Sequence, residues 1–325
     1  MTVNAEPKRH HFVPVTYLKQ FTDEDGFLHV YRKGDLSAPF LSKPERTGFA
    51  NHYYSQPLPN GTTDNSALER VLGTIETEWP NCYQRIVRQT SISHREFVDL
   101  ITFMLVQRVH VPACRDTVEH LLATHVKTSL RELALGNHLP PLPREYPSLL
   151  DNIEVSIDPH QSLYAMTGIG QGFSRIIDQI GFEFVHNKTE IPFISSDNPV
   201  SAWNPTVPEK LLRPYHVDGP KPIMELFFPV SSRILLRGHT TLKRRFSLRG
   251  PGDVETRNKG LVTRANRITA RFGYQQIFAS GSENGPLIDK WRSHSPVIDS
   301  KVASHWDGDM DKPGMVFGPV PPKPK

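Results

Sequence analysis

Short runs of alternating apolar and polar residues dominate the N-terminal part of the chain, and this period predicts strands. Residues 27–31 combine aromatic and β-branched side chains, and a second apolar pair follows at 40–41. Runs of this kind separated by turn residues pair as hairpins, so residues 27–41 are expected to form one. A proline pushes the residue before it toward extended geometry. An extended piece is therefore expected at 10–14, and a further short strand at 49–54.

In the middle of the chain, apolar residues recur three and four positions apart, which is the period of a helix. The first such stripe consists of Leu68, Val71, Leu72 and Ile75. Pro80 should break or kink this helix, because it lacks a backbone donor. Ser93 and Glu96 have the spacing of a capping box, in which both side chains satisfy the first backbone donors of a helix. We therefore expect a helix that ends before Pro112 and another over residues 113–135.

The second half of the chain mixes both periods. A helical pattern covers residues 161–180, and the runs at 182–186 and 191–195 are expected to pair as a hairpin across Asn187-Lys188-Thr189. The remaining expected elements are strands at 224–230, 233–236 and 274–280 and a helix at 255–271.

These elements predict a single compact α+β domain over residues 10–292. It should have an N-terminal β-hairpin, a central helical layer, and a C-terminal, mostly antiparallel sheet with one packed helix. Residues 140–147 are rich in proline and mark a sub-boundary within the domain. Residues 1–9 are expected to be a flexible arm, and the proline-bearing residues 293–325 a disordered tail.

Composition is that of a globular protein, with 37% hydrophobic and 22% charged residues in a chain of 325. No apolar run approaches the roughly 20 residues needed to span a bilayer, so no membrane partner is expected. The basic start is not followed by an apolar core, which argues against a signal peptide. Two cysteines, Cys82 and Cys114, cannot form a disulfide framework. A reducing cytoplasm is therefore the expected location.

Positive charge is concentrated in one segment of a chain whose net charge is only +4. Residues 233–271 contain eleven Lys or Arg against two acidic residues. Four arginines fall in one sector of the helix expected there: Arg257, Arg264, Arg267 and Arg271. Such a row suits phosphate groups, so the segment predicts binding of nucleic acid or another anion. The alternative is a solvated basic face that binds nothing in particular.

Several short motifs follow one another in a specific order. The first is His-His-Phe-Val-Pro within residues 10–21, and the last is Asn266 before the final strand. Between them lie residues 27–31, Tyr53-Tyr54, Leu68-Glu69 with Glu76, Gln107-Arg108, residues 193–200 and residues 228–231. This order resembles a bacterial family known as domain of unknown function 4238, over about residues 8–280. The resemblance implies little about activity, because the family has no agreed function. The connectors at 140–159 and 204–222 are longer than the resemblance implies.

The centre of the candidate site is the stretch from Phe193 to Val200, where an apolar run ends in Asp197-Asn198-Pro199. This pattern predicts a strand that enters a tight turn and leaves a carboxylate at the strand end. Functional side chains often lie on loops that a rigid scaffold holds. Asp197 and Asn198 form a ligand pair, or else Asp197 bonds local backbone amides and Asn198-Pro199 is only a turn. Both interpretations stay open.

Two other polar groups could reach this strand end. Adjacent residues on an extended backbone point to opposite faces, so at most one of His10 and His11 should face a given site, unless the chain bends there. It would serve as a metal ligand or general base there, or the arm is only a structural contact. Glu69 and Glu76 lie two turns apart on one helix face and could hold Mg or Mn, or could simply be solvated. The candidate metal ligands are thus His11, Glu69, Glu76 and Asp197.

Arg108 completes the candidate catalytic set, which consists of His10, His11, Arg108 and Asp197. It lies four residues after Met104 and eight after Leu100, on the apolar stripe of its helix. A buried guanidinium needs an acidic partner. Asp197 or Glu76 is the expected partner, and the alternative role is a structural ion pair.

Three functions remain open at this stage. The first is a metal-dependent hydrolase, perhaps acting on nucleic acid, whose His and carboxylate ligands hold an ion that activates water. The second is a non-catalytic module that binds nucleic acid or another anion through residues 233–271. The third is a structural or partner-binding protein with a buried polar network. The His-His-x-x-Pro opening also resembles ββα metal-dependent nucleases, but the chain lacks the second Asn–His pair that they need.

Overall fold

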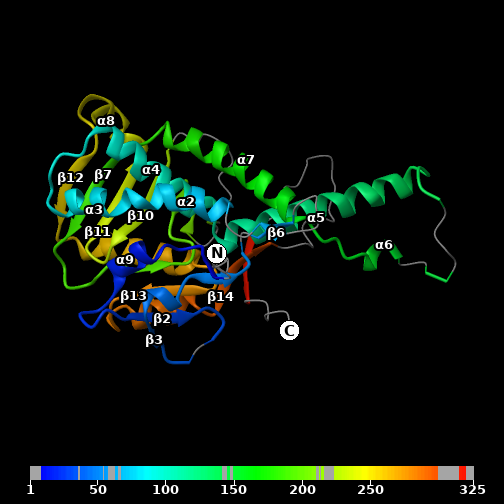
Figure 1. The fold of residues 1–325 in the computed structure, drawn as a ribbon, viewed down its shortest axis with the longest axis horizontal. Helices are drawn as coiled ribbons and strands as arrows, with labels where there is room; N and C mark the ends of the chain where they lie inside the picture. Colours follow the sequence, from blue (N-terminus) through cyan, green and yellow to red (C-terminus); the bar gives the residue numbers. More distant parts are fainter. Residues whose placement is uncertain are drawn as a thin grey trace, which may run out of the picture.

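The computed structural model describes residues 9–35, 37–53, 55–57, 63–64, 67–140, 145–146, 149–209, 212, 214–215, 223–298 and 315–319 (Figure 1). The N-terminal elements are β1 (Arg9–His11), α1 (Val15–Leu18), β2 (Leu28–Arg32), β3 (Phe40–Ser42), β4 (Phe49–Asn51), β5 (Gln56–Pro57) and β6 (Thr63–Asp64). The helices α2 (Ala67–Thr77), α3 (Trp79–Val87), α4 (His94–Val109), α5 (Pro112–Leu135), α6 (Leu149–Asn152) and α7 (Pro159–Ile177) follow.

The C-terminal elements begin with the strands β7 (Gly181–Asn187), β8 (Ser195–Ser196), β9 (Ser201–Trp203), β10 (Glu225–Ser231) and β11 (Ile234–His239). They continue with α8 (Lys243–Arg249), β12 (Gly252–Thr256), α9 (Lys259–Phe272), β13 (Gln276–Ala279), α10 (Gly285–Trp291), β14 (His294–Ile298) and β15 (Met315–Pro319). This order confirms the α+β class, with the helical layer in the middle of the chain.

A five-stranded sheet with the order β12-β7-β11-β10-β9 forms the centre of the fold. It is antiparallel except between β12 and β7. Successive strand side chains point to opposite faces, and the apolar residues divide accordingly. Phe182 and Phe184 of β7 join the core beneath α3, α4 and α7. Val185 of β7 and Phe227 of β10 pack instead with α9 on the other face. Helices therefore cover both faces of this sheet, as Figure 1 shows.

A second sheet, with the order β3-β2-β13-β8, lies beside the first. β2 and β3 form the hairpin predicted at 27–41, and β13 joins this hairpin to β8. The chain leaves the second sheet after Ser196 and enters the first at Ser201. The candidate strand end at Asp197 therefore connects the two sheets.

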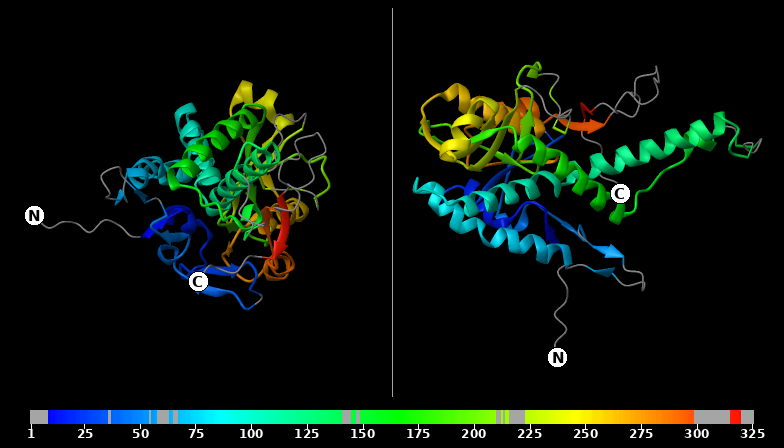
Figure 2. Two further views of the ribbon diagram at one scale, coloured as in Figure 1. Left: turned by 90° about the vertical axis from the view of Figure 1, so that its right-hand side faces the viewer. Right: turned by 90° about the horizontal axis from the view of Figure 1, so that it is seen from above.

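Helix α5 extends beyond the body of the molecule, as the views in Figures 1 and 2 agree. Its buried residues lie in its first half, up to Val118. In the described part of the chain, no single helix has the length and hydropathy to cross a membrane; the bent pair of α4 and α5 meets that test by length and composition alone.

The hairpin predicted from residues 182–186 and 191–195 is wrong. β7 pairs with β11 and with β12, whereas β8 pairs with β13 in the other sheet. The Asn187 turn does exist, since its side chain donates to the Ile191 carbonyl at 2.7 Å. It redirects the chain, but the segments on its two sides do not pair with each other. β7 is buried along its whole length, so the backbone groups on both of its edges need strand partners, which are β11 and β12.

Two further elements differ from the expectation. The helix predicted at 255–271 begins only at Lys259, after Asn258 caps it by accepting from the Gly260 and Leu261 amides. Residues 252–256 form β12 instead. Part of the expected disordered tail also has structure, because β14 and β15 pair antiparallel.

The capping box predicted at Ser93 is confirmed. Ser93 Oγ accepts from the Glu96 amide at 3.2 Å, and the Glu96 carboxylate accepts from the Ser93 amide at 2.7 Å. We expect Ser93→Ala to lower the free energy of unfolding by about 1 kcal/mol, because one helix donor loses its acceptor. Chemical denaturation would measure this, with the neighbouring exposed Ser91→Ala as control. Equal stability of the two variants would contradict the role of the cap.

Candidate functional site

Three segments that are distant in sequence meet at the end of β8. The Tyr17 hydroxyl of α1 donates to the Pro229 carbonyl at 2.7 Å. It also lies 2.7 Å from Ser195 Oγ, from which it accepts. Tyr17 and Ser195 are both fully buried. The N-terminal motif, the strand-end motif and the 228–231 motif are therefore joined through a single side chain.

The Asp197 carboxylate is fully buried and accepts three backbone hydrogen bonds. Oδ1 accepts from the Tyr274 amide at 2.8 Å, and Oδ2 accepts from the Gln275 and Gln276 amides at 2.7 and 3.0 Å. Burial raises the pKa of Asp197 to about 6, while these three donors and the Lys33 ammonium act in the opposite direction. The carboxylate bonds backbone amides, as one of the two interpretations expected, but these amides are distant in sequence and not local. The carboxylate fixes the connection between α9 and β13.

Arg108 is buried, with 2% of its surface exposed, as its place on the apolar stripe predicts. Its guanidinium donates to the Val200 carbonyl at 3.0 Å and to the Pro214 carbonyl. It also lies 3.9 Å from the centre of the Tyr215 ring. Burial lowers the pKa of Arg108. The expected acidic partner is not what the structure shows, since within the described ranges carbonyl oxygens and an aromatic ring hold this cation.

Asn198 adds further hydrogen bonds beside Asp197 and Arg108. Its amide donates to the Phe272 carbonyl at the end of α9 at 2.9 Å. The Tyr215 hydroxyl lies 2.9 Å from Asn198 Oδ1 and 3.2 Å from the Arg108 carbonyl. Asp197 and Arg108 therefore belong to one buried network, but through backbone groups and Tyr215 rather than through an ion pair.

The N-terminal histidines lie on β1, which pairs with β4. His10 is fully buried and His11 is half-buried, so the two side chains do differ in environment as the extended backbone requires. The His11 ring lies 5.6 Å from the Phe49 ring, and burial lowers the pKa of His11. Glu76 is half-buried on α2, whereas the Glu69 side chain lies outside what the structure describes. Among the side chains described, no three His, Cys, Asp or Glu residues form a group that could hold a metal ion. The metal site with Mg or Mn therefore stays a prediction.

The predicted row of four arginines differs from the structure at both ends. Arg257 precedes α9 and is exposed, whereas Arg271 is only 4% exposed. Between them, Arg264 pairs with the buried Glu225 carboxylate at 2.7 Å, and Arg267 donates to both oxygens of Glu209. Most of the positive charge on α9 is therefore already balanced within the fold.

The other basic residues of the same segment lie on α8. Their sequence, Lys-Arg-Arg-Phe-Ser-Leu-Arg at 243–249, places four cations in seven residues. Lys243 is half-buried, Arg244, Arg245 and Arg249 are exposed, and none of the four forms an ion pair with a carboxylate of the described chain. We call these four residues the α8 cluster. The local interleaving of basic and aromatic residues is the signal that could have singled them out from the sequence.

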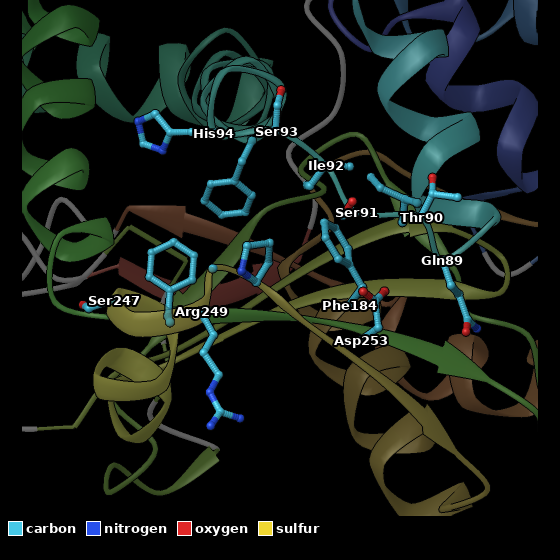
Figure 3. Close-up of a pocket in the computed structure, with 15 residues that line it drawn as sticks. Gln89, Thr90, Ser91, Ile92, Ser93, His94, Phe184, Ser247, Arg249 and Asp253 are labelled. Atoms are coloured by element: carbon cyan, nitrogen blue, oxygen red, sulfur yellow. The ribbon is translucent and has the colours of Figure 1, made fainter.

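A pocket of about 760 Å³ adjoins the α8 cluster (Figure 3). It lies between the α3–α4 connection and the α8–β12 connection, over β7. Its lining includes Phe97, Phe184 and Phe246 as well as Arg249 and Asp253. α8 can lie this close to β7 because Gly181 has no side chain, and a Cβ at that position would collide with the Leu242 carbonyl. The sequence gives no pattern from which this pocket could be predicted, since its walls come from distant segments.

Comparison with known proteins identifies the family but no function. The family model described as "Protein of unknown function (DUF4238)" matches residues 9–283. The chain belongs to this family. No curated protein and no solved structure matches it. The DUF4238 match confirms the resemblance drawn from the order of motifs, and it ends before β14.

Within this DUF4238 chain, the motifs that carried the resemblance contact one another. Asn266 of α9 accepts from the Ile194 amide at 3.1 Å and donates to the Pro192 carbonyl at 2.8 Å. Tyr17 joins the N-terminal motif to Ser195, and Arg108 bonds Val200. These motifs therefore build the corner between the two sheets.

Proposed function

We propose that this protein binds nucleic acid through the α8 cluster and does so without catalysing a reaction. The observation that carries the proposal is the group of Lys243, Arg244, Arg245 and Arg249, which have no carboxylate partner among the described residues. Arg and Lys in such a group bind phosphates, with release of counterions from the nucleic acid. The proposal keeps the basic segment as the binding region but moves the contact from α9 to α8.

The α8 cluster is unfavourable for the stability of its own helix. Lys243 and Arg244 lie in the first turn, where the helix dipole disfavours positive charge and where no acidic residue compensates it. Arg245 and Arg249 are four residues apart, so their like charges repel along one helix face. Leu248 adds an apolar side chain that is 77% exposed. A partner that supplies negative charge would relieve the two electrostatic costs, which supports binding over a merely solvated face.

The metal-dependent hydrolase has less support from the geometry. It would use Asp197 as a ligand, and both oxygens of that carboxylate already accept backbone donors. The three arginines of the α8 cluster, in contrast, are exposed and need no rearrangement to meet phosphates. We therefore favour binding over hydrolysis.

Fluorescence anisotropy with a labelled single-stranded oligonucleotide tests the proposal. We expect binding that weakens steeply between about 50 and 200 mM salt. Arg244→Gln combined with Arg249→Gln should reduce the slope of log affinity against log salt by about 1.4, since each phosphate contact on a single strand contributes about 0.7.

The matched control is Arg175→Gln combined with Lys290→Gln, which removes the same charge from exposed positions on α7 and α10. It should leave the slope unchanged. An equal effect of both double variants would mean that only net charge matters, and no binding at low salt would refute the proposal.

A further inference from the structure

The pocket beside the α8 cluster has the size and surroundings of a ligand site. Its volume of about 760 Å³ is in the range of small-molecule sites, which span roughly 300–1,000 Å³. Figure 3 shows the α3–α4 connection, with Thr90 and Ser91, on one side of the hollow and Phe184 and Asp253 on the other. Arg249 belongs both to its lining and to the α8 cluster. A strand whose phosphates lie on α8 would therefore pass the mouth of the pocket.

Aromatic rings form one wall of this pocket. The Phe97 and Phe246 rings lie 5.2 Å apart, and Phe246 also contacts Phe182 edge-on at 5.6 Å. Phe246 is half-buried, so part of its ring is accessible, while Phe97 behind it is 7% exposed. Planar bases stack on such rings, and proteins that bind single strands use this contact repeatedly.

Asp253 provides a polar group next to the aromatic wall. It is the cross-strand partner of Phe184 on β12, and its side chain is 40% exposed. Its Oδ1 lies 3.0 Å from His186 Nε2. Oδ2 has no hydrogen-bond partner among the described residues. His186 therefore fixes the orientation of a carboxylate that can still accept hydrogen bonds from a ligand.

A carboxylate accepts hydrogen bonds and, when ionised, donates none. Of the bases in nucleic acid, guanine alone presents two adjacent donors on its Watson–Crick edge, the ring N1–H and the exocyclic amino group. Adenine and cytosine present one donor beside an acceptor, and uracil or thymine presents one donor between two acceptors. The Asp253 carboxylate can therefore pair with both donors of guanine. With any other base, an acceptor atom of that base would face a carboxylate oxygen.

We propose that this pocket takes an unpaired guanine of a single strand, stacked against Phe246 with its Watson–Crick edge on Asp253. This inference rests on the proposed function, since the α8 cluster holds the phosphates that flank the base. Recognition of splayed bases by stacking and by their Watson–Crick edge is the usual way in which proteins read single strands.

The test compares two labelled oligouridines that differ only in a central guanine or a central adenine. The wild-type protein should bind the guanine strand about tenfold more tightly, because both guanine donors can pair with the carboxylate. Asp253→Asn should remove this preference, because the amide offers a donor where guanine needs an acceptor. Phe246→Leu keeps an apolar side chain and should weaken both complexes severalfold. Ser282→Ala, at an exposed position outside the pocket lining, is the control and should change neither.

The outcomes separate the two proposals. Salt-dependent binding without a guanine preference, or a preference that Asp253→Asn leaves intact, would overturn the base pocket and keep the role of α8. Absence of binding to either strand would overturn both. Circular dichroism of each variant establishes that a loss of affinity is not a loss of fold.

Discussion

Asp197→Asn should lower the free energy of unfolding by about 3–5 kcal/mol at pH 8. The carboxylate accepts from the amides of Tyr274, Gln275 and Gln276 with two oxygens. Asparagine keeps one acceptor and turns a donor toward at least one of these amides, so buried donors lose their partner. Because the carboxylate is completely buried, water cannot replace it. Urea denaturation of both proteins would give the difference directly.

A neighbouring carboxylate provides the control for this experiment. Asp116 accepts from the Tyr274 hydroxyl at 2.6 Å, on the same connection between α9 and β13, but it is exposed. Asp116→Asn keeps an acceptor and water can reach the site, so the expected loss is below about 1 kcal/mol. If Asp197→Asn were as mild as Asp116→Asn, the carboxylate would not hold the connection, and a ligand role for Asp197 would regain support.

The sequence predicted local features of this fold well, because local features depend on neighbouring residues. Ser93 and Glu96 are three positions apart, and their capping box forms as predicted. Arg108 follows Met104 by one helical turn, and both are buried. The hairpin of β2 and β3 is also a local feature, because its two strands are consecutive in the chain and are joined by a short connection.

Features that depend on distant segments could not be predicted in the same way. β7 pairs in parallel with β12, a strand that follows α8. The turn at Asn187 had instead predicted that β7 pairs with residues 191–195. Because Arg108 is a cation, the prediction gave it an acidic partner. Its partners are the backbone carbonyls of Val200 and Pro214, and since every residue has such a carbonyl, the sequence could not indicate them.

The candidate binding surface shows the same limit. The excess of positive charge in residues 233–271 was visible in the sequence, but its distribution between free and paired cations was not. Arg264 and Arg267 are balanced by Glu225 and Glu209, which precede α9 by many residues. The positions of these two glutamates in the fold leave little unbalanced positive charge on α9. The candidate contact therefore moves to α8.

The stability of the protein should also fall between about pH 6.5 and pH 4 through the protonation of His110. This residue follows α4, and its amide bonds the Val106 carbonyl at 2.9 Å. Burial lowers the pKa of His110 from 6.5 to about 4. As the pH falls, the unfolded chain takes up the proton before the folded chain does. The stabilisation is therefore complete above pH 6.5 and is lost on the way to pH 4.

At about 1.4 kcal/mol per pKa unit, and allowing for the remaining exposure of the ring, the loss should be about 2–3 kcal/mol. His110→Gln removes the titrating group. Over the same pH interval, the unfolding free energy of this variant should therefore fall by about 2–3 kcal/mol less than that of the wild type. His94→Gln changes an exposed histidine at the start of the same helix and is the matched control. Parallel curves for the wild type and His110→Gln would show instead that the ring is solvated in the folded state and that other groups cause the loss of stability in acid.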